Sequence, residues 1–198
     1  MPKEIYFSVD MEADGPSPAD NSMLSIGAVV YDDKGNRLKE TFSMNINPLE
    51  GHVQDAGTMS WWKGFPDAWA ACHENPQDAE VVMPIFLDWV ESLKKKYNAS
   101  AMFVAYPAAF DYTYVMWYLM KFCEGCTPFG KPNSKPFSDI VDMQSLAMGI
   151  LRQPYSKCAK NRWPKKWFSD FPHTHIAVED ALAQGEIFAY MLRLCING

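Results

Sequence analysis

Two acidic side chains, Asp10 and Glu12, follow a short apolar run near the start of the chain. Ile5, Phe7 and Val9 alternate with more polar residues, which is the periodicity of a β-strand. Successive side chains of a strand point to opposite faces, so a spacing of two places both carboxylates on one face. Such crowding of like charge is unfavourable unless a cation or a shared proton relieves it, and oxygen ligands suit Mg²⁺ or Mn²⁺. A metal site is one interpretation; a solvated acid pair is the other, and this spacing alone favours the second.

Two later positions hold residues of the same chemical kind. Asp111 lies one turn into a predicted helix that follows the apolar segment 101–106, and α/β sheets place ligand sites at the carboxyl ends of strands. The structural alternative is an acid that stabilises the helix through its dipole. Asp180 stands in the first turn of the last predicted helix, and His175 lies just before that helix. These two residues are close enough in sequence to share a site.

The elements that would position these residues follow an α/β pattern. Three strands open the chain, at about 5–12, 23–31 and 37–46, and the third runs antiparallel to the second. A helix follows, with Asn75 and Pro76 as its N-cap and first residue, and Pro84 marks a kink in it or its true start. The fold class is α/β, with a mixed central sheet of three antiparallel strands and then parallel strands, flanked by helices. The later predicted elements are a strand at 101–106, a helix at 107–122, a strand at 137–141, a helix at 142–151 and a helix from about 177.

The composition predicts one globular domain over residues 1–198. The hydrophobic content of 48% is enough for a well-buried core. The net charge of -6 argues against a general basic coating for duplex DNA, although a local basic groove around a metal-charged centre stays open. No apolar stretch reaches the ~20 residues of a membrane span, and no signal for export is present. We therefore expect a cytoplasmic protein without a membrane partner.

The cysteines are expected to be free thiols. Five of them form an odd set in a chain without an export signal, which indicates a reducing compartment. Cys123 and Cys126 form one C-x-x-C pair, and no second pair accompanies it. A structural zinc site is therefore the weaker interpretation.

Two aromatic stretches could contact nucleic acid. An exposed Trp61 and Trp62 pair could stack on nucleobases, at roughly 1–3 kcal/mol per base, but core filling is the interpretation that large aromatic residues favour. Residues 152–171 show no clear period and interleave lysine and arginine with Trp163, Trp167 and Phe168. This basic-aromatic loop either contacts single-stranded nucleic acid or is a solvated irregular loop, and the sequence favours neither.

Three segments together resemble the motifs of the DEDDh 3′–5′ exonucleases, the group that includes polymerase proofreading subunits, oligoribonuclease and ribonuclease T. The family's D-x-E motif, with a small residue and a glycine after it, is similar to residues 10–15 (DMEADG). Its A-x-F-D motif is similar to residues 108–111 (AAFD), and its H-x-A-x-x-D-A motif is similar to residues 175–181 (HIAVEDA). Each motif alone is weak, but their order across nearly the whole chain is specific. The resemblance implies a ribonuclease-H-like fold.

Some positions depart from the family pattern. Ala13 stands where Thr or Ser is common, and residues 105–107 (AYP) stand where many members carry Asn or His to position the substrate. The long loop through Pro16 and Pro18 and the tryptophan pair are similar to compact bacterial and phage exoribonuclease-like members.

The resemblance implies an enzyme that releases nucleoside 5′-monophosphates from the 3′ end of single-stranded nucleic acid, RNA rather than DNA. It implies two Mg²⁺ or Mn²⁺ ions, one held by Asp10, Glu12 and Asp180 and the other by Asp10 and Asp111. His175 would be the general base, because imidazole titrates near neutral pH. A homodimer is common in such a family. The implied substrate contacts are Ala13, Trp61, Trp62 and Phe110.

Two other functions fit the same fold. A catalytically inactive exonuclease-fold module would bind nucleic acid or a protein partner, but it would be expected to lack one or more of the acids, and all five expected residues are present. A ribonuclease-H-type endonuclease would cut inside a strand. The pairing of His175 with Asp180 downstream argues against that activity.

Overall fold

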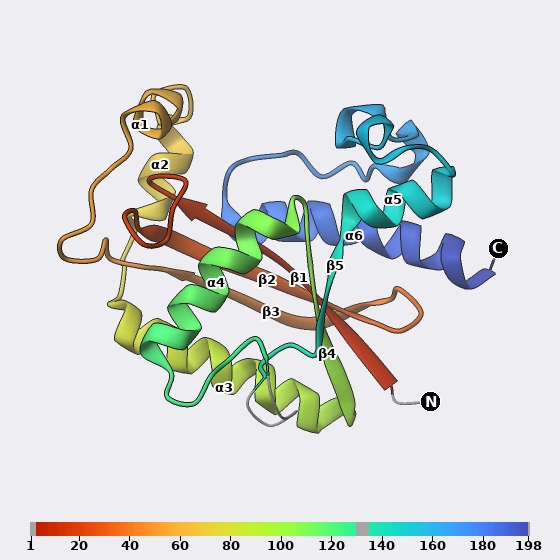
Figure 1. Ribbon diagram of the computed structural model, residues 1–198, viewed down its shortest axis with the longest axis horizontal. Helices are drawn as coiled ribbons and strands as arrows, with labels where there is room; N and C mark the ends of the chain where they lie inside the picture. Colours follow the sequence, from red (N-terminus) through yellow and green to blue (C-terminus); the bar gives the residue numbers. More distant parts are fainter. Residues whose placement is uncertain (1–2, 130–134, 198) are drawn as a thin grey trace.

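The computed structural model describes residues 3–129 and 135–197, and a mixed sheet forms its centre (Figure 1). Its strands are β1 (Lys3–Ala13), β2 (Met23–Asp32), β3 (Arg37–Asn45), β4 (Ala99–Ala105) and β5 (Asp139–Asp142). They lie in the order β3-β2-β1-β4-β5. The pairs β1–β2 and β2–β3 are antiparallel, whereas β4 is parallel to both β1 and β5. The predicted sheet of antiparallel and then parallel strands is confirmed.

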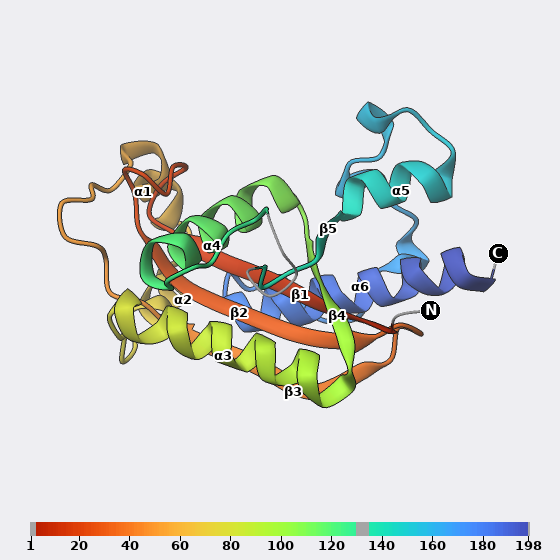
Figure 2. The same cartoon turned by 60° about the horizontal axis from the view of Figure 1, so that its bottom comes forward.

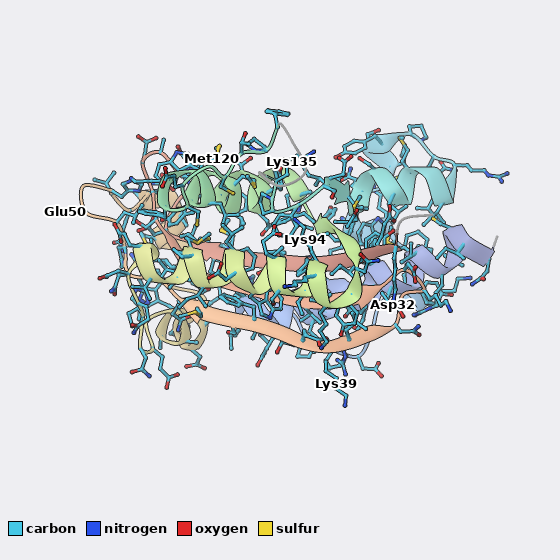
Figure 3. The ribbon with its side chains drawn as sticks, turned by 90° about the horizontal axis from the view of Figure 1, so that it is seen from below. Asp32, Lys39, Glu50, Lys94, Met120 and Lys135 are labelled. Atoms are coloured by element: carbon cyan, nitrogen blue, oxygen red, sulfur yellow. The ribbon has the colours of Figure 1, made fainter. Side chains whose placement is uncertain are left out.

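Helices cover both faces of this sheet (Figure 2). One face packs against α3 (Ala79–Tyr97) and α4 (Ala108–Phe122), and the other packs against α5 (Met143–Leu151) and α6 (Ala177–Asn197). Figure 3, seen from below, shows α3 in front of the strands. Two shorter helices, α1 (Ala56–Trp62) and α2 (Pro66–Cys72), pack against the start of β2. Within residues 3–129 and 135–197, no helix combines the length and the apolar character needed to cross a membrane.

The start of α3 differs from the prediction. The helix begins at Ala79 rather than at Pro76. Gln77 is held in an extended conformation, because its N–H donates to the carbonyl of Asn45 at 3.0 Å and its own carbonyl accepts from the N–H of Asn47 at 2.9 Å. This bridge continues the chain beyond β3 and delays the helix. Pro84 lies inside α3 and does not start it.

Strand β1 separates the two cores by alternation. Its odd-numbered residues from Ile5 to Ala13 face α3 and α4 and are buried. The even-numbered residue Tyr6 belongs instead to the core beneath α6. Gln184 of α6 reaches the same face, since its side-chain amide donates to Ser8 Oγ at 3.1 Å and to the carbonyl of Val9 at 3.0 Å. Asp10 and Glu12 continue this even-numbered series.

A glycine in β2 lets α6 approach the sheet closely. Gly27 pairs with Asp10 in the β1–β2 register. A Cβ atom added at Gly27 would lie 2.2 Å from the backbone nitrogen of Val178, which leaves no room for a side chain. The first turn of α6 therefore lies directly on β2. This contact carries Asp180 toward Asp10.

The segment at 152–171 has more local structure than an irregular loop. It contains three 3₁₀-helices, η2 (Tyr155–Lys157), η3 (Lys160–Arg162) and η4 (Lys165–Trp167). Trp163 and Trp167 are buried in the core shared with α5 and α6, and the indole N–H of Trp163 donates to the carbonyl of Cys158 at 2.7 Å. These two tryptophans anchor the segment, so they are not available to stack on a substrate.

The cysteines are free thiols, as predicted. Cys123 follows the last residue of α4, and Cys126 is half-buried beyond it. Neither thiol belongs to a group of side chains that could hold a metal ion within the described part of the chain.

Replacing Gly27 by Ala is expected to destabilise the protein by about 1–3 kcal/mol, the usual cost of forcing an extra group into a filled core. Urea unfolding followed by circular dichroism measures this free energy. Gly149→Ala is the matched control, because nothing lies within 4 Å of the added Cβ. Alanine in that helix position should stabilise the protein by up to about 1 kcal/mol. Equal destabilisation of the two variants would contradict the role assigned to Gly27.

Candidate active site

Three carboxylates meet at the end of β1. Asp10 and Glu12 project from the α6 side of this strand, and Asp180 projects from the first turn of α6. Ligand oxygens of the three side chains lie within 4.8 Å of one another. Glu12 and Asp180 are buried, and Asp10 is half-buried. The structure thus brings together three of the predicted site residues.

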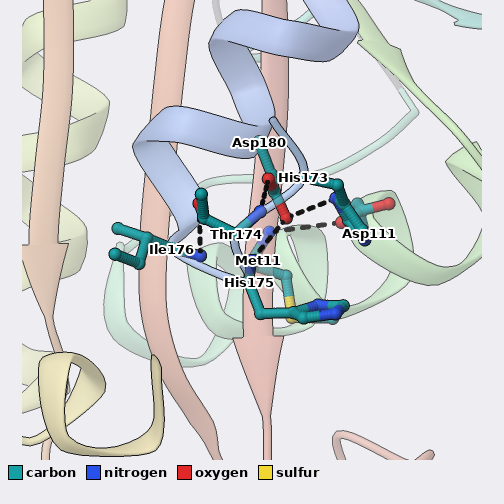
Figure 4. A network of polar contacts seen from close by, with 7 residues as sticks. All are labelled: Met11, Asp111, His173, Thr174, His175, Ile176 and Asp180. Carbon is teal, nitrogen blue, oxygen red and sulfur yellow. Dashed lines mark hydrogen bonds and ion pairs between the residues drawn. The ribbon is translucent and has the colours of Figure 1, made fainter. Parts of the chain in front are cut away.

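Asp111 approaches the cluster from α4. It lies in the first turn of that helix, just beyond β4, and it is buried. The backbone N–H of Met11 donates to Asp111 Oδ1 at 3.2 Å (Figure 4). Since Met11 stands between Asp10 and Glu12 in the chain, the fourth predicted acid borders the same cluster.

Burial and mutual repulsion act against ionisation of these acids. The pKa of Asp10 is raised well above its usual range. Burial is the largest cause, and the charges of Asp111, Glu12 and Asp180 add to it. Burial, followed by the charges of Asp180 and Asp111, raises the pKa of Glu12 to about 9. Burial also raises the pKa of Asp111 to about 7. At neutral pH the cluster therefore attracts protons or cations.

Asp180 differs from the other acids because three donors hold its carboxylate (Figure 4). His173 Nδ1 lies 2.7 Å from Oδ2. The backbone N–H groups of Thr174 and His175 donate to Oδ1 and Oδ2 at 2.9 and 3.0 Å. Burial acts to raise the pKa of Asp180, but the bond from His173 and these backbone bonds outweigh it, so the pKa is lowered. Asp180 is the fixed anion of the cluster.

His175 borders the acids with a backbone φ of 58°. Its ring meets the rings of Trp61 and Phe65 edge-on, with centroids 4.7 and 4.2 Å away. One of its nitrogen atoms lies within 4.8 Å of an Asp180 oxygen. Burial and then the charge of His173 lower the pKa of His175, although Asp180 acts in the opposite direction. The imidazole is therefore neutral at pH 7 and can accept a proton.

The predicted tryptophan pair divides between surface and core. Trp61 is 43% exposed beside His175, whereas Trp62 is 2% exposed. The indole N–H of Trp62 donates to the carbonyl of Ala13 at 3.0 Å, so Trp62 holds the end of β1. The prediction of Trp62 as a substrate contact is wrong, because the ring fills the core. Ala13 is buried beneath this contact, and Phe110 is 37% exposed on α4.

A cavity of about 280 Å³ opens beside Asp10 and Asp180 and contains residues outside the predicted site. Its wall comes from the end of β4, from the segment at 160–171 and from α6. His173 could have been identified from the sequence, because it stands two residues before His175. Lys160, Phe168 and Phe171 belong to the basic-aromatic stretch at 152–171, whereas no pattern singles out Tyr106. Among the lining residues that the sequence analysis did not assign to the site are Tyr106, Lys160, Phe168, Phe171 and His173.

The donor set at the end of β1 fits a hard divalent cation. Asp10, Glu12 and Asp180 offer only carboxylate oxygens, the ligands that Mg²⁺ and Mn²⁺ prefer. The raised pKa values of Asp10 and Glu12 mean that their ionised forms are unfavourable, and a bound cation would offset this cost. A second group, His173, His175 and Asp180, also lies within 4.8 Å. In that group His173 already bonds Asp180, so the all-oxygen set is the better metal site.

The sheet order and the neighbouring acids define a class of protein, the 3′–5′ exonucleases with a ribonuclease-H-like fold. Over residues 6–192 the chain matches the family described as the 3′-5′ exoribonuclease Rv2179c-like domain, and it belongs to that family. It is also 27% identical over 192 residues to the 3′-5′ DNA exonuclease Cap18 of Escherichia coli. That similarity covers 97% of this chain and 94% of the relative.

Solved structures share this fold. A 3′-exonuclease with 3′-end specific recognition of a histone mRNA stem-loop has a TM-score of 0.68 at 13% identity, over 98% of this chain and 83% of that chain. The Mg²⁺- and Mn²⁺-bound form of Pop2p from S. pombe has a TM-score of 0.61 at 13% identity, over 94% and 82%. The zinc-bound complex of E. coli exonuclease I with single-stranded DNA has a TM-score of 0.59 at 14% identity. That comparison covers 100% of this chain but 41% of exonuclease I.

Without divalent cations, the protein is expected to lose stability as pH rises. Folding raises the pKa of Glu12 from 4.5 to about 9. Between these values the folded state binds more protons than the unfolded state, so the free energy of unfolding falls with rising pH. Thermal unfolding in chelator, at several pH values between about 5 and about 9, measures this dependence.

The matched variants are Glu12→Gln, which should flatten the pH dependence, and Glu74→Gln at an exposed position, which should not. Mn²⁺ at about 100 times its dissociation constant should stabilise the parent by about 2.7 kcal/mol at pH 8 and the Glu12→Gln variant by less. A parent protein with the same melting temperature in chelator across this range would contradict the charge balance described for the cluster.

Proposed function

We propose that this protein shortens single-stranded nucleic acid from the 3′ end, RNA in preference to DNA, and releases nucleoside 5′-monophosphates. The convergence of Asp10, Glu12, Asp111 and Asp180 from three separate segments beside His175 is the observation that carries this proposal. Membership of a 3′–5′ exonuclease family supports the direction of hydrolysis. The presence of all five residues argues against an inactive binding module.

The acids would hold two divalent cations, Mg²⁺ or Mn²⁺. Asp10, Glu12 and Asp180 would bind one, and Asp10 with Asp111 would bind the other. When bound, such ions supply Lewis-acid chemistry, because they neutralise charge on a phosphate and lower the pKa of a water. The three hydrogen bonds to Asp180 fix the position of its carboxylate before any ion arrives. The metal-bound form of Pop2p from S. pombe supports this choice of cations by analogy of fold.

His175 would take the proton of the attacking water. The water oxygen would form the new bond to phosphorus, and the 3′-oxygen of the preceding nucleotide would leave with the bonding electron pair. Burial keeps the imidazole neutral, as this step requires, and the contacts with Trp61 and Phe65 restrict its ring. The backbone N–H of His175 also donates to Asp180, which fixes the position of the base relative to the acids.

The preference for RNA over DNA depends on how the protein recognises the sugar of the substrate. The family description, exoribonuclease, favours RNA, whereas the relative Cap18 carries the name DNA exonuclease, which favours DNA. A pocket separates the two by contacts to the 2′-hydroxyl. Trp61 and Phe110 would stack on the terminal base, at roughly 1–3 kcal/mol per base. The homodimer and the cytoplasmic location stay predictions.

RNA and DNA strands of one sequence, labelled at the 5′ end, should be shortened progressively in Mg²⁺ or Mn²⁺ and stay intact in chelator. The reason is that only the cations offset the repulsion between the acids and the phosphate. Gel electrophoresis displays the ladder, and chromatography identifies the 5′-monophosphates. RNA should be shortened faster than DNA. Internal fragments at the earliest times would contradict exonuclease activity, and faster shortening of DNA would make DNA the substrate.

His175→Ala should lower kcat by about 10²–10⁴-fold, the usual contribution of a general base. Its affinity for Mn²⁺ should not change, because every carboxylate remains; calorimetric titration measures this. His173→Ala removes a bond to Asp180 but not the base, so kcat should fall by a smaller factor. His73→Ala changes an exposed residue and is the matched control. If the His173 variant were as slow as the His175 variant, the base would be wrongly assigned.

A further inference from the structure

The cavity beside Asp10 and Asp180 has the chemistry of a nucleotide site. Lys160 is the one lysine or arginine among its lining residues. Phe168 and Phe171 also line it and are 40% and 46% exposed. A cation suits a phosphate, and exposed aromatic rings suit a base. The cavity therefore offers both kinds of contact next to the acids.

Lys160 lines the same cavity as Asp10 and Asp180 without forming a salt bridge to either. Its charge acts to lower the pKa of Asp10, so the two groups are within electrostatic reach. No salt bridge within the described part of the chain involves Lys160 Nζ. The backbone N–H of Lys160 donates to the Tyr106 hydroxyl at 2.9 Å, and the side-chain Nζ of Lys160 lies 5.8 Å from the centroid of the Tyr106 ring. The backbone is held in place while the charge is available to an anion.

The segment that carries these residues is fixed before substrate arrives. Trp163 packs against Tyr106 and Trp167, with ring centroids 5.1 and 6.0 Å away. Both tryptophans are buried, whereas Phe168 next to them is exposed. Little ordering of the segment is therefore needed when a ligand binds, which favours affinity.

The cavity is separate from Trp61 and Phe110, the residues proposed to stack on the terminal base. Its lining includes Asp10 and Asp180 but neither Trp61 nor Phe110. In Figure 1, α1 and the segment with the 3₁₀-helices lie on opposite sides of the first turn of α4. A strand with its last base at Trp61 and its scissile phosphate at the acids would continue toward the cavity.

We propose that this cavity binds the nucleotide that precedes the scissile phosphate, a proposal that rests on the proposed function. Lys160 pairs with a phosphate of the strand, and Phe168 and Phe171 stack on the base. The ligand class is single-stranded nucleic acid with at least one nucleotide beyond the cleaved one. A substrate without that nucleotide does not use the cavity.

The test compares an oligonucleotide with the 4-nitrophenyl ester of a nucleoside 5′-monophosphate, which has a scissile phosphate but no preceding nucleotide. Lys160→Gln should lower kcat/KM for the oligonucleotide about tenfold or more, as expected for one charge-assisted hydrogen bond. The loss on the ester should be several times smaller. The double change Phe168→Ala with Phe171→Ala should show the same contrast. Lys166→Gln is the matched control, because Lys166 is exposed on the same segment and does not line the cavity.

Equal losses on the oligonucleotide and the ester would overturn the proposal, because Lys160 would then act on the acids or on the scissile phosphate. A Lys166→Gln loss as large as that of Lys160→Gln would also overturn it, because the effect would be general attraction of a polyanion. Thermal unfolding of each variant establishes that the fold is intact.

A binding measurement distinguishes a failure of this proposal from a failure of the proposed function. In the Glu12→Gln background, fluorescence anisotropy of a labelled single strand measures affinity without shortening. Lys160→Gln should make the dependence of log K on log salt shallower by about 0.7, the value for one phosphate contact on a single strand. Lys160-dependent binding without hydrolysis by the parent would support the subsite and overturn the proposed function. Hydrolysis by the parent with an unchanged salt slope would overturn the subsite alone.

Discussion

Repulsion among neighbouring carboxylates is the interaction that the rest of this structure must overcome. Asp10, Glu12 and Asp180 would separate if they were free, yet their oxygens lie within 4.8 Å of one another. Apolar contacts elsewhere hold them there. The odd-numbered side of β1 packs into one core, and α6 packs into the other, across the narrow contact at Gly27. Hydrophobic burial on both sheet faces thus sustains an arrangement of charge that is unfavourable by itself.

The surroundings give the four acids unequal properties. Asp180 receives three hydrogen bonds and stays ionised, whereas burial raises the pKa values of Asp10, Glu12 and Asp111. One acid is therefore a permanent anion and the others gain a proton or a cation according to conditions. The chain around His173 and His175 produces this difference, because it supplies the donors to Asp180 and the candidate base within three residues.

The sheet and the proximity of the acids to the histidine were predictable from the sequence, because they depend on local periodicity and on the order of motifs. Alternation along β1 was enough to place Asp10 and Glu12 on one face, and the placement of Asp111 and Asp180 in first turns followed from the helix boundaries. Trp62 could not be separated from Trp61, since adjacent residues of a short helix share one pattern and only the fold decides which ring is covered. The start of α3 depends on a bridge between Gln77 and Ile46, which are distant in sequence. The mixture of basic and aromatic residues marked the stretch that contains Lys160, but no local rule places Lys160 beside Asp10, because that stretch has no period.

The segment at 152–171 assigns anchoring and exposure to different side chains. Trp163, Trp167 and Cys158 are buried and hold it to the rest of the protein, while Phe168 and Phe171 stand at the surface. Exchange of the outward residues should consequently be tolerated by the folded protein, because the packed ones remain. Substitutions at these few outward positions would alter the contacts offered to nucleic acid while the anchored scaffold stays the same, so these positions are the natural choice for a randomised library.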